Sequence, residues 1–220
     1  EYILNCRQMG IRILPPDINR STGSFSVEDG SIRYGMAAVK GIGKPVMEAI
    51  VEERERGGLF SSLKDFCRRL SGKEVNKRTI ENFIKAGAFD SFGGTRKQFM
   101  MIYVQVMDTV NQEKKSSMTG QMSLFDIMGE EDKKSFEIRL PDVGEYAKES
   151  KLAFEKEVLG VYISGHPLEE YADVWKKNIT AATSDFYPME ESGLPKVRDG
   201  AKVILSLIHI SEPTRLLSIS

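Results

Sequence analysis

The chain has 220 residues, of which 40% are hydrophobic, and its formal net charge at pH 7 is -1. This length and composition favour a folded protein with one or two cores and exclude a fibre or a wholly disordered chain. No apolar run approaches the roughly 20 residues of a membrane-spanning helix, and the first ten residues lack a signal-peptide pattern. We therefore expect a cytoplasmic protein with no membrane partner. Because the chain does not begin with Met, we expect a fragment of a longer protein.

The charge is unevenly distributed along the chain. Residues 31–100 carry 14 basic and 8 acidic side chains, whereas residues 101–220 carry 14 and 20. The basic part is a candidate polyanion-binding surface, although charge alone favours an ordinary solvated face. Cys6 and Cys67 are far apart and have no Cys or His near them, which excludes the usual zinc spacings and a disulfide framework.

The predicted elements begin with short β structure. An apolar run over residues 11–14 ends at two prolines, and Asp29-Gly30 predicts a hairpin turn between two short strands. Residues 32–113 then follow a helical pattern, and one long helix carries an apolar stripe at Phe99, Ile102, Tyr103, Val106 and Val110. A second helical stretch is predicted over 143–161, and Asp199-Gly200 precedes an apolar run of strand type.

The segment YGMAAVKGIGKPVMEAIVEERERGG predicts two helices joined by a tight hairpin. A short helix ends at Lys40, the turn follows at residues 41–43, and Pro45 suits the first turn of the next helix. Glycine permits positive φ and close approach, so N–H groups at the start of the second helix can face a phosphate oxygen.

Particular roles are expected within this turn. Ile42 should fill the core, while Lys40 and Lys44 should add charge near phosphates without reading bases. We expect a positive φ at Gly43, which would make Gly43→Val damaging. A lone Gly-x-Gly turn between helices is as often structural as functional.

A degenerate second copy strengthens the functional interpretation. In NKRTIENFIKAGAFDSFGGTRKQFM a helix ends at residues 85–87, and a longer loop leads to a helix that begins near Thr95. Two such units can pack as a pseudo-symmetric pair that grips both strands of a duplex across the minor groove. The candidate DNA-binding residues are Lys40, Gly41, Ile42, Gly43, Lys44, Lys77, Arg78, Lys85, Gly87 and Arg96.

Five blocks together resemble a known family: ILPPDIN, IRYGMAAVKGIG, NKRTIENFIKAGAFDSFGGTR, GQMSLF and EKEVLGVYISGHPLEEY. In this order and spacing they are similar to the C-terminal part of the bacterial DNA polymerase III alpha-subunit family, the replicative polymerases, over about residues 1–205. The resemblance implies a mainly α fold with a short β hairpin at the N-terminus. The implied domains are the end of the fingers (1–30), a tandem helix-hairpin-helix domain (31–113), a linker (114–135), a helical connector (136–195) and the first strand of a truncated OB-fold (196–205).

The resemblance also implies the activity of the parent protein, a DNA-directed DNA polymerase, or nucleotidyltransferase, of DNA replication. Its catalytic aspartates and their Mg²⁺ would lie in a palm upstream of Glu1, so we expect no catalytic residue, metal ligand or cofactor here and no activity of the fragment alone. Asp17, Asp29 and Asp90 lie in turn contexts, and His166 is expected to act in a turn. The alternatives are a stand-alone helix-hairpin-helix module of a repair or recombination protein and a scaffold without a nucleic-acid role.

An apolar cluster within the polar linker is similar to the family's internal sliding-clamp-binding peptide. It comprises Gln121, Met122, Ser123, Leu124 and Phe125. Two exposed apolar side chains can enter a pocket of a partner while a Gln amide bonds a backbone edge. From residues alone, a segment folded onto its own core was equally compatible. The implied partners are double-stranded DNA, the sliding clamp (beta subunit) and, through the parent, other subunits of the replicative holoenzyme.

Residues 206–220, SLIHISEPTRLLSIS, depart from the family pattern where a second OB-fold strand is expected. They resemble the translated read-through of a sequencing adapter. We therefore expect a non-native tail and assign no function to His209, Glu212 or Arg215.

Overall fold

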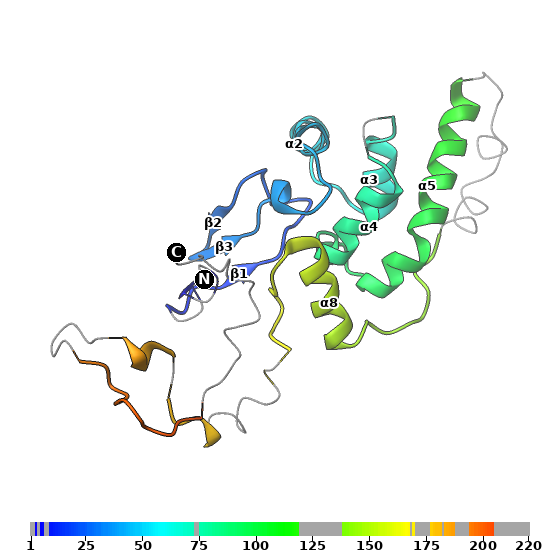
Figure 1. Ribbon diagram of the computed structural model, residues 1–220. Coiled ribbons are helices and arrows are strands. Elements are labelled where there is room, and N and C mark those ends of the chain that lie inside the picture. Colours follow the sequence, from blue (N-terminus) through cyan, green and yellow to red (C-terminus); the bar gives the residue numbers. More distant parts are fainter. Residues whose placement is uncertain are drawn as a thin grey trace, which may run out of the picture. The chain divides into compact units, whose positions relative to one another are not determined.

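A computed structural model describes residues 3, 5–6, 9–72, 75–118, 138–167, 169, 177–181, 183–187 and 194–204. The chain divides into two compact units, residues 1–165 and residues 166–220. The first unit is mainly helical and has a small three-stranded sheet near its start, which confirms the fold class predicted from the sequence (Figure 1). Within the described ranges, no helix has both the length and the apolar character needed to cross a membrane.

The sheet has the strand order β1-β3-β2. Strand β1 (Ile13–Leu14) is parallel to β3 (Ser31–Arg33), and β2 (Ser26–Glu28) is antiparallel to β3. The two residues between β2 and β3 are Asp29 and Gly30, with φ of 48° and 72°. A two-residue type I′ hairpin turn requires positive φ at both central positions, so the predicted hairpin is confirmed.

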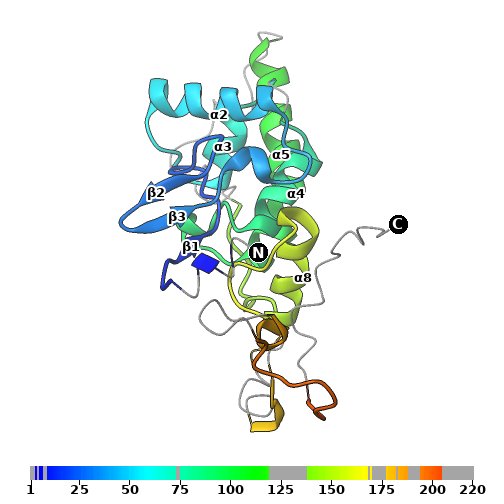
Figure 2. The ribbon, with the colours of Figure 1, turned by 60° about the vertical axis from the view of Figure 1, so that its left-hand side comes forward.

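The helical part follows the sheet. In chain order it contains the 3₁₀ turn η1 (Met36–Ala38), helices α2 (Lys44–Gly57), α3 (Leu63–Arg69) and α4 (Lys77–Ala86), the 3₁₀ turn η2 (Asp90–Phe92) and helix α5 (Arg96–Met118). Ser62 and Asn76 cap α3 and α4, because each side chain accepts a backbone N–H three residues further on. Helix α5 packs against α3 and α4, whereas α2 runs across the direction of α5 (Figures 1 and 2).

Phenylalanine rings form the centre of the core. Phe60, Phe66, Phe83, Phe89 and Phe99 are each at most 3% exposed. Their rings meet edge to face, with centroids 5.0 to 6.4 Å apart. This arrangement adds a directional attraction to the burial of large apolar surfaces. The predicted apolar stripe of the long helix is confirmed, since three of its residues are buried and the other two pack against the core.

The segment between β1 and β2 and the end of α8 (Lys148–Leu159) belong to the same core. Ile18 is fully buried, and its N–H donates to the carbonyl of Ala88 at 2.9 Å. The carbonyls of Val158 and Leu159, at the end of α8, accept the N–H of Lys40 at 2.8 Å and the hydroxyl of Tyr34 at 2.9 Å. Helix α8 also packs on α4 (Figures 1 and 2). Residues on both sides of the linker therefore form one helical unit.

The predicted second helical stretch begins later than expected, at Lys148 instead of Val143. The N–H of Val143 bonds the carbonyl of Pro141 at 2.9 Å in a tight turn, and Gly144 follows. Glycine is a poor helix residue because its backbone loses the most freedom on folding. The residues from 138 to 147 consequently run as an irregular strap beside α5.

An ion cluster around the buried side chains of Arg96 and Glu155 fixes α8 to the start of α5. The side chain of Arg96 is 3% exposed and donates to Asp90 at 3.0 Å and to Glu155 at 3.2 Å. Glu155 is fully buried, and it also accepts the backbone N–H groups of Ile163 and Ser164 at 2.8 and 3.0 Å. A buried charge is tolerated only when its hydrogen-bonding capacity is satisfied, as it is here.

The second unit has less regular structure. It contains the 3₁₀ turn η4 (Thr183–Phe186), and the turn predicted at Asp199-Gly200 is present, with Gly200 at a φ of 76°. The strand predicted over 196–205 is not formed within the described residues 194–204, whose backbone bonds lead to Thr180 and Asp185. Ala181 and Pro195 are isolated bridge positions, and a strand needs a longer ladder with a neighbouring strand than single bridges provide.

Replacing Glu155 by alanine should lower the free energy of unfolding by about 3–5 kcal/mol, because it removes one partner of a buried ion pair. Two backbone N–H groups also lose their acceptor. The matched control is Glu149→Ala on the exposed face of the same helix, which should stay within about 0.5 kcal/mol. Urea denaturation followed by circular dichroism measures both, and equal midpoints would contradict this role of Glu155.

Candidate nucleic-acid interface

The first predicted hairpin forms between η1 and α2. The N–H of Ile42 donates to the carbonyl of Val39 at 3.1 Å and closes a four-residue turn. Gly41 has a φ of 76°, a conformation that favours glycine. Ile42 is 7% exposed and lies in the core, as predicted.

The expectation of a positive φ at Gly43 is wrong. Gly43 has φ -78° and ψ 159°, an extended conformation that any residue can adopt. A Cβ at this position would approach only the Cδ of Pro45, at 3.5 Å. Because the turn closes between Val39 and Ile42, Gly41 is its third residue, the position at which a type II turn requires positive φ.

The N-terminus of α2 is open to solvent. Gly43 is the N-cap residue and supplies no capping side chain, and the first turn of the helix contains no acidic residue. Gly43, Lys44 and Pro45 are all exposed. Uncapped backbone N–H groups and the positive end of the helix dipole favour an anion at such a position.

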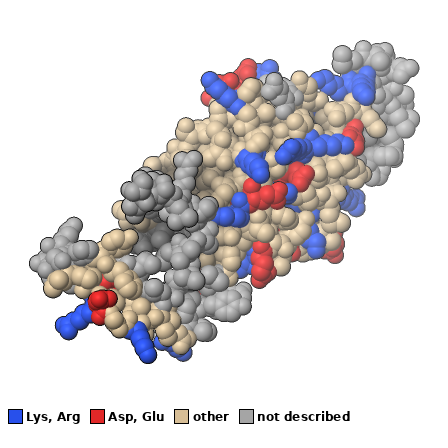
Figure 3. All heavy atoms as spheres, in the orientation of Figure 1, with Lys and Arg blue, Asp and Glu red and all other residues tan. Residues whose placement is uncertain are grey.

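Beside this turn lies an open hollow of about 460 Å³ between the hairpin, α4 and α8. It is lined by Lys40, Lys77, Arg78, Glu81, Asn82, Lys85 and Glu157. The hollow thus brings together four of the predicted DNA-binding residues. The side-chain amide of Asn82 donates to the carbonyl of Lys40 at 2.8 Å, which fixes the hairpin to α4. Figure 3 shows basic and acidic side chains next to one another over α4 and α8.

Lys85 differs from the other three cations of the hollow. Its side chain is 13% exposed, and its amine lies 2.9 Å from a carboxylate oxygen of Glu81 and 2.9 Å from one of Glu157. Burial disfavours the charged amine, but hydrogen bonds to Glu157 and Glu81 outweigh it and raise the pKa of Lys85. Lys40, Lys77 and Arg78 are exposed.

The second turn is built differently from the first. Gly87 ends α4 with a φ of 82° and is buried, and a Cβ there would overlap the guanidinium of Arg96. Arg96 itself is held in the ion cluster with Asp90 and Glu155. Neither Gly87 nor Arg96 lines the hollow.

A carboxylate of the chain already lies at the N-terminus of α5. Glu145 accepts the N–H of Arg96 at 3.3 Å, of Lys97 at 3.2 Å and of Tyr146 at 2.8 Å, and Lys151 lies 3.4 Å from it. Burial opposes ionisation of Glu145, but these N–H donors outweigh it and lower the pKa of the carboxyl. The N-terminus of α5, unlike that of α2, is therefore already occupied by a carboxylate of the protein itself.

Sequence reasoning missed four residues of these sites: Glu81, Asn82, Glu145 and Glu157. Glu81 lies one helical turn from both Lys77 and Lys85, and Asn82 lies one turn from Arg78, so helical spacing could have identified both. Nothing in the sequence near Glu145 or Glu157 indicates that they reach residues on the other side of the linker.

The predicted clamp-binding residues Gln121 to Phe125 lie outside the described residues. Within the described ranges, no group of three or more His, Cys, Asp or Glu side chains is placed to hold a metal ion.

A 3₁₀ turn and a helix joined by a glycine turn, with an uncapped helix start and adjacent lysines, are typical of a helix-hairpin-helix motif. The family model described as "Helix-hairpin-helix motif" matches residues 10–99.

Proteins named DNA polymerase III subunit alpha are similar over most of the chain. The protein of Borreliella burgdorferi is 39% identical over 77% of the chain, that of Deinococcus radiodurans 39% over 78%, and that of Escherichia coli 34% over 91%. The chain spans 15%, 13% and 17% of these relatives. It is therefore a homologue of a region of the bacterial DNA polymerase III alpha subunit that contains a helix-hairpin-helix motif.

Gly41→Ala should lower the free energy of unfolding by about 1–3 kcal/mol, because alanine is strained at positive φ. Its Cβ would also press on the Asn82 amide nitrogen at 3.1 Å. Gly43→Ala is the matched comparison and should change stability by no more than about 0.5 kcal/mol. Thermal melting of both variants tests this assignment, and a larger loss for Gly43→Ala would refute it.

Proposed function

We propose that this chain holds duplex DNA by its phosphates as part of a bacterial replicative DNA polymerase. The observation that carries the proposal is the open N-terminus of α2 beside the hollow that contains Lys40, Lys77 and Arg78. Lys40 belongs both to the turn and to the lining of the hollow, where it lies with the exposed Lys77 and Arg78. Such a surface matches a row of phosphate oxygens.

Binding of this kind has no sequence preference, because phosphate contacts position a duplex without reading its bases. Lys40 and Lys44 flank the turn and supply charge, while Gly43 allows the phosphate to approach the backbone closely. Lys77 and Arg78, at the start of α4, extend the basic surface away from the turn.

The grip that we propose is asymmetric. The first turn and the hollow contact DNA, whereas Gly87 and Arg96 act inside the protein. Glu145 uses the N–H groups at the start of α5 that a phosphate would need. The two turns thus share a sequence pattern and differ in function.

The parent protein, in this proposal, carries out template-directed DNA synthesis in the cytoplasm together with other replicative holoenzyme subunits. Support comes from relatives named DNA polymerase III subunit alpha. Polymerisation needs divalent ions held by acidic side chains, which the family resemblance places in a palm upstream of Glu1, so the role that we propose for this chain is non-catalytic. Its contribution is to hold the product duplex.

We further propose that Gln121, Leu124 and Phe125 tether the polymerase to the sliding clamp. Support comes from the sequence, in which an apolar pair and a Gln lie within a polar, charged segment. Two apolar side chains in a pocket contribute about 2–3 kcal/mol each by area, and ordering of the peptide subtracts from this. A modest affinity is sufficient, because a clamp on the same duplex meets the peptide at high effective concentration.

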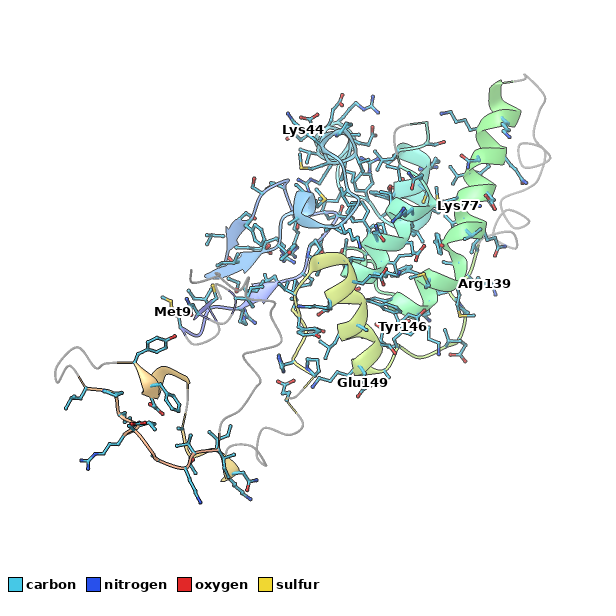
Figure 4. All side chains as sticks on the ribbon, viewed as in Figure 1. Met9, Lys44, Lys77, Arg139, Tyr146 and Glu149 are labelled. Atoms are coloured by element: carbon cyan, nitrogen blue, oxygen red, sulfur yellow. The ribbon has the colours of Figure 1, made fainter. Side chains whose placement is uncertain are left out.

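The DNA proposal predicts a strong dependence of affinity on salt. Lys40→Ala and Lys44→Ala should each reduce the slope of log K against log salt concentration by about 0.9, the value for one phosphate contact. Arg139→Ala is the control, since Figure 4 shows Arg139 well apart from Lys44. Fluorescence anisotropy of a labelled duplex at several salt concentrations measures the slopes.

A flat salt dependence of the wild-type chain, or a strong preference for one DNA sequence, would refute the proposed mode of binding. If Arg139→Ala reduced the slope of log K against log salt concentration as much as Lys44→Ala does, the DNA-binding surface would not be centred on the first turn.

The clamp proposal predicts that Gln121→Ala weakens binding to an immobilised sliding clamp and that Leu124→Ala with Phe125→Ala nearly abolishes it. DNA affinity and the melting temperature should stay unchanged, because the role that we propose for these side chains is to contact the clamp. Normal clamp binding by the double variant would exclude this peptide as the tether. A melting temperature several degrees lower would assign the two side chains to the core instead.

A further inference from the structure

One wall of the basic hollow comes from the far side of the linker. The helix-hairpin-helix match ends at residue 99, whereas α8 begins at Lys148. Helix α8 is nevertheless tied to the first turn, because the carbonyl of Val158 accepts the N–H of Lys40 at 2.8 Å. The adjacent residue, Glu157, lines the hollow.

The hollow carries two carboxylates as well as four cations, so its formal charge is +2 and not +4. Both carboxylates contact the same cation. The amine of Lys85 lies 2.9 and 3.1 Å from the two oxygens of Glu157 and 2.9 Å from Glu81. Lys77 is paired with Asp108 at 2.8 Å, but it is exposed, as are Lys40 and Arg78. Lys85 is only 13% exposed and contacts two carboxylates, so it is the cation of the hollow that the protein itself neutralises most fully.

Glu157 is the more readily displaced of the two partners of Lys85. Its side chain is 49% exposed, compared with 35% for Glu81, and it comes from a different helix. On the Glu157 side the pair is open to solvent, which screens the attraction between the two charges. A phosphate oxygen is an acceptor of the same kind as a carboxylate oxygen, and it can replace Glu157 on the amine at modest cost.

The same strap and helix supply a second internal carboxylate. Glu145 fills the N-terminus of α5, and Glu157 contacts Lys85. Residues 138–159 therefore place carboxylates against Lys85 and against the N–H of Arg96, two residues that the sequence predicted to contact phosphates.

We propose that Glu157 competes with DNA phosphates for Lys85 and thereby limits the affinity of the hollow for duplex DNA. This inference rests on the proposed function and adds its regulation. Lys85 contributes to DNA binding only when Glu157 is displaced or neutralised. The position of α8 thus sets how strongly the first turn holds a duplex.

The test compares Glu157→Gln with Glu149→Gln in the full chain. The control removes the same charge from the same helix, and Figure 4 shows Glu149 well apart from Lys77. Anisotropy with a labelled duplex at low salt should give about 2- to 5-fold tighter binding for Glu157→Gln, the effect of one exposed pair. The salt slope should steepen by up to about 0.9, and Glu149→Gln should match wild type.

Lys85→Ala gives an independent readout. In the wild-type background it should change DNA affinity little, because Lys85 is already neutralised. In the Glu157→Gln background it should remove the whole gain. Melting curves of all variants check that the fold is kept.

The outcomes separate this inference from the proposed function. If the wild type binds DNA with a salt dependence but Glu157→Gln and Glu149→Gln have equal DNA affinities, the proposed competition by Glu157 is wrong and the proposed function stands. A large loss of affinity for Lys85→Ala in the wild-type background would also overturn the competition. Failure of both wild type and Glu157→Gln to bind duplex DNA would overturn the proposed function and the competition with it.

Discussion

The buried guanidinium of Arg96 is the constraint on which the helical unit depends. It bonds the carbonyl of Lys85 at the end of α4, Asp90 in the following loop and Glu155 of α8. Leaving such a charge unpaired inside a protein costs several kcal/mol, so these three elements are stable only when all are in place. The cluster therefore fixes α8 beside α4, and with it the wall that Glu157 adds to the hollow. The surface that we propose for DNA is therefore shaped by an interaction that lies beneath it.

Local signals made much of this fold predictable. The hairpin at Asp29-Gly30 follows from the conformational freedom of two residues, and the buried stripe of α5 follows from helical spacing. Ile42 was recognised as a core residue because it lies between two glycines of a tight turn. In each case the residues that determine the local structure are neighbours in the sequence.

The rest depends on contacts between distant parts of the chain. Arg96 was predicted to contact DNA, since an arginine after a glycine turn looks the same whether it is exposed or buried. Its burial is decided by Glu155, 59 residues away. Glu145 reaches the start of α5 across the linker in the same way. The error at Gly43 was more local: a hydrogen bond from Ile42 to Val39 moves the positive φ to Gly41.

The central claim is that the first turn and the hollow meet DNA while the second turn serves the interior. The most direct test is to follow the backbone amide resonances of the ¹⁵N-labelled chain by NMR during titration with a short duplex. The account predicts the largest shifts at residues 41–44, 46 and 77–85, with little change at residues 95–97, whose N–H groups bond Gln98 or Glu145. Largest shifts at residues 95–97, or an even distribution over the chain, would contradict it.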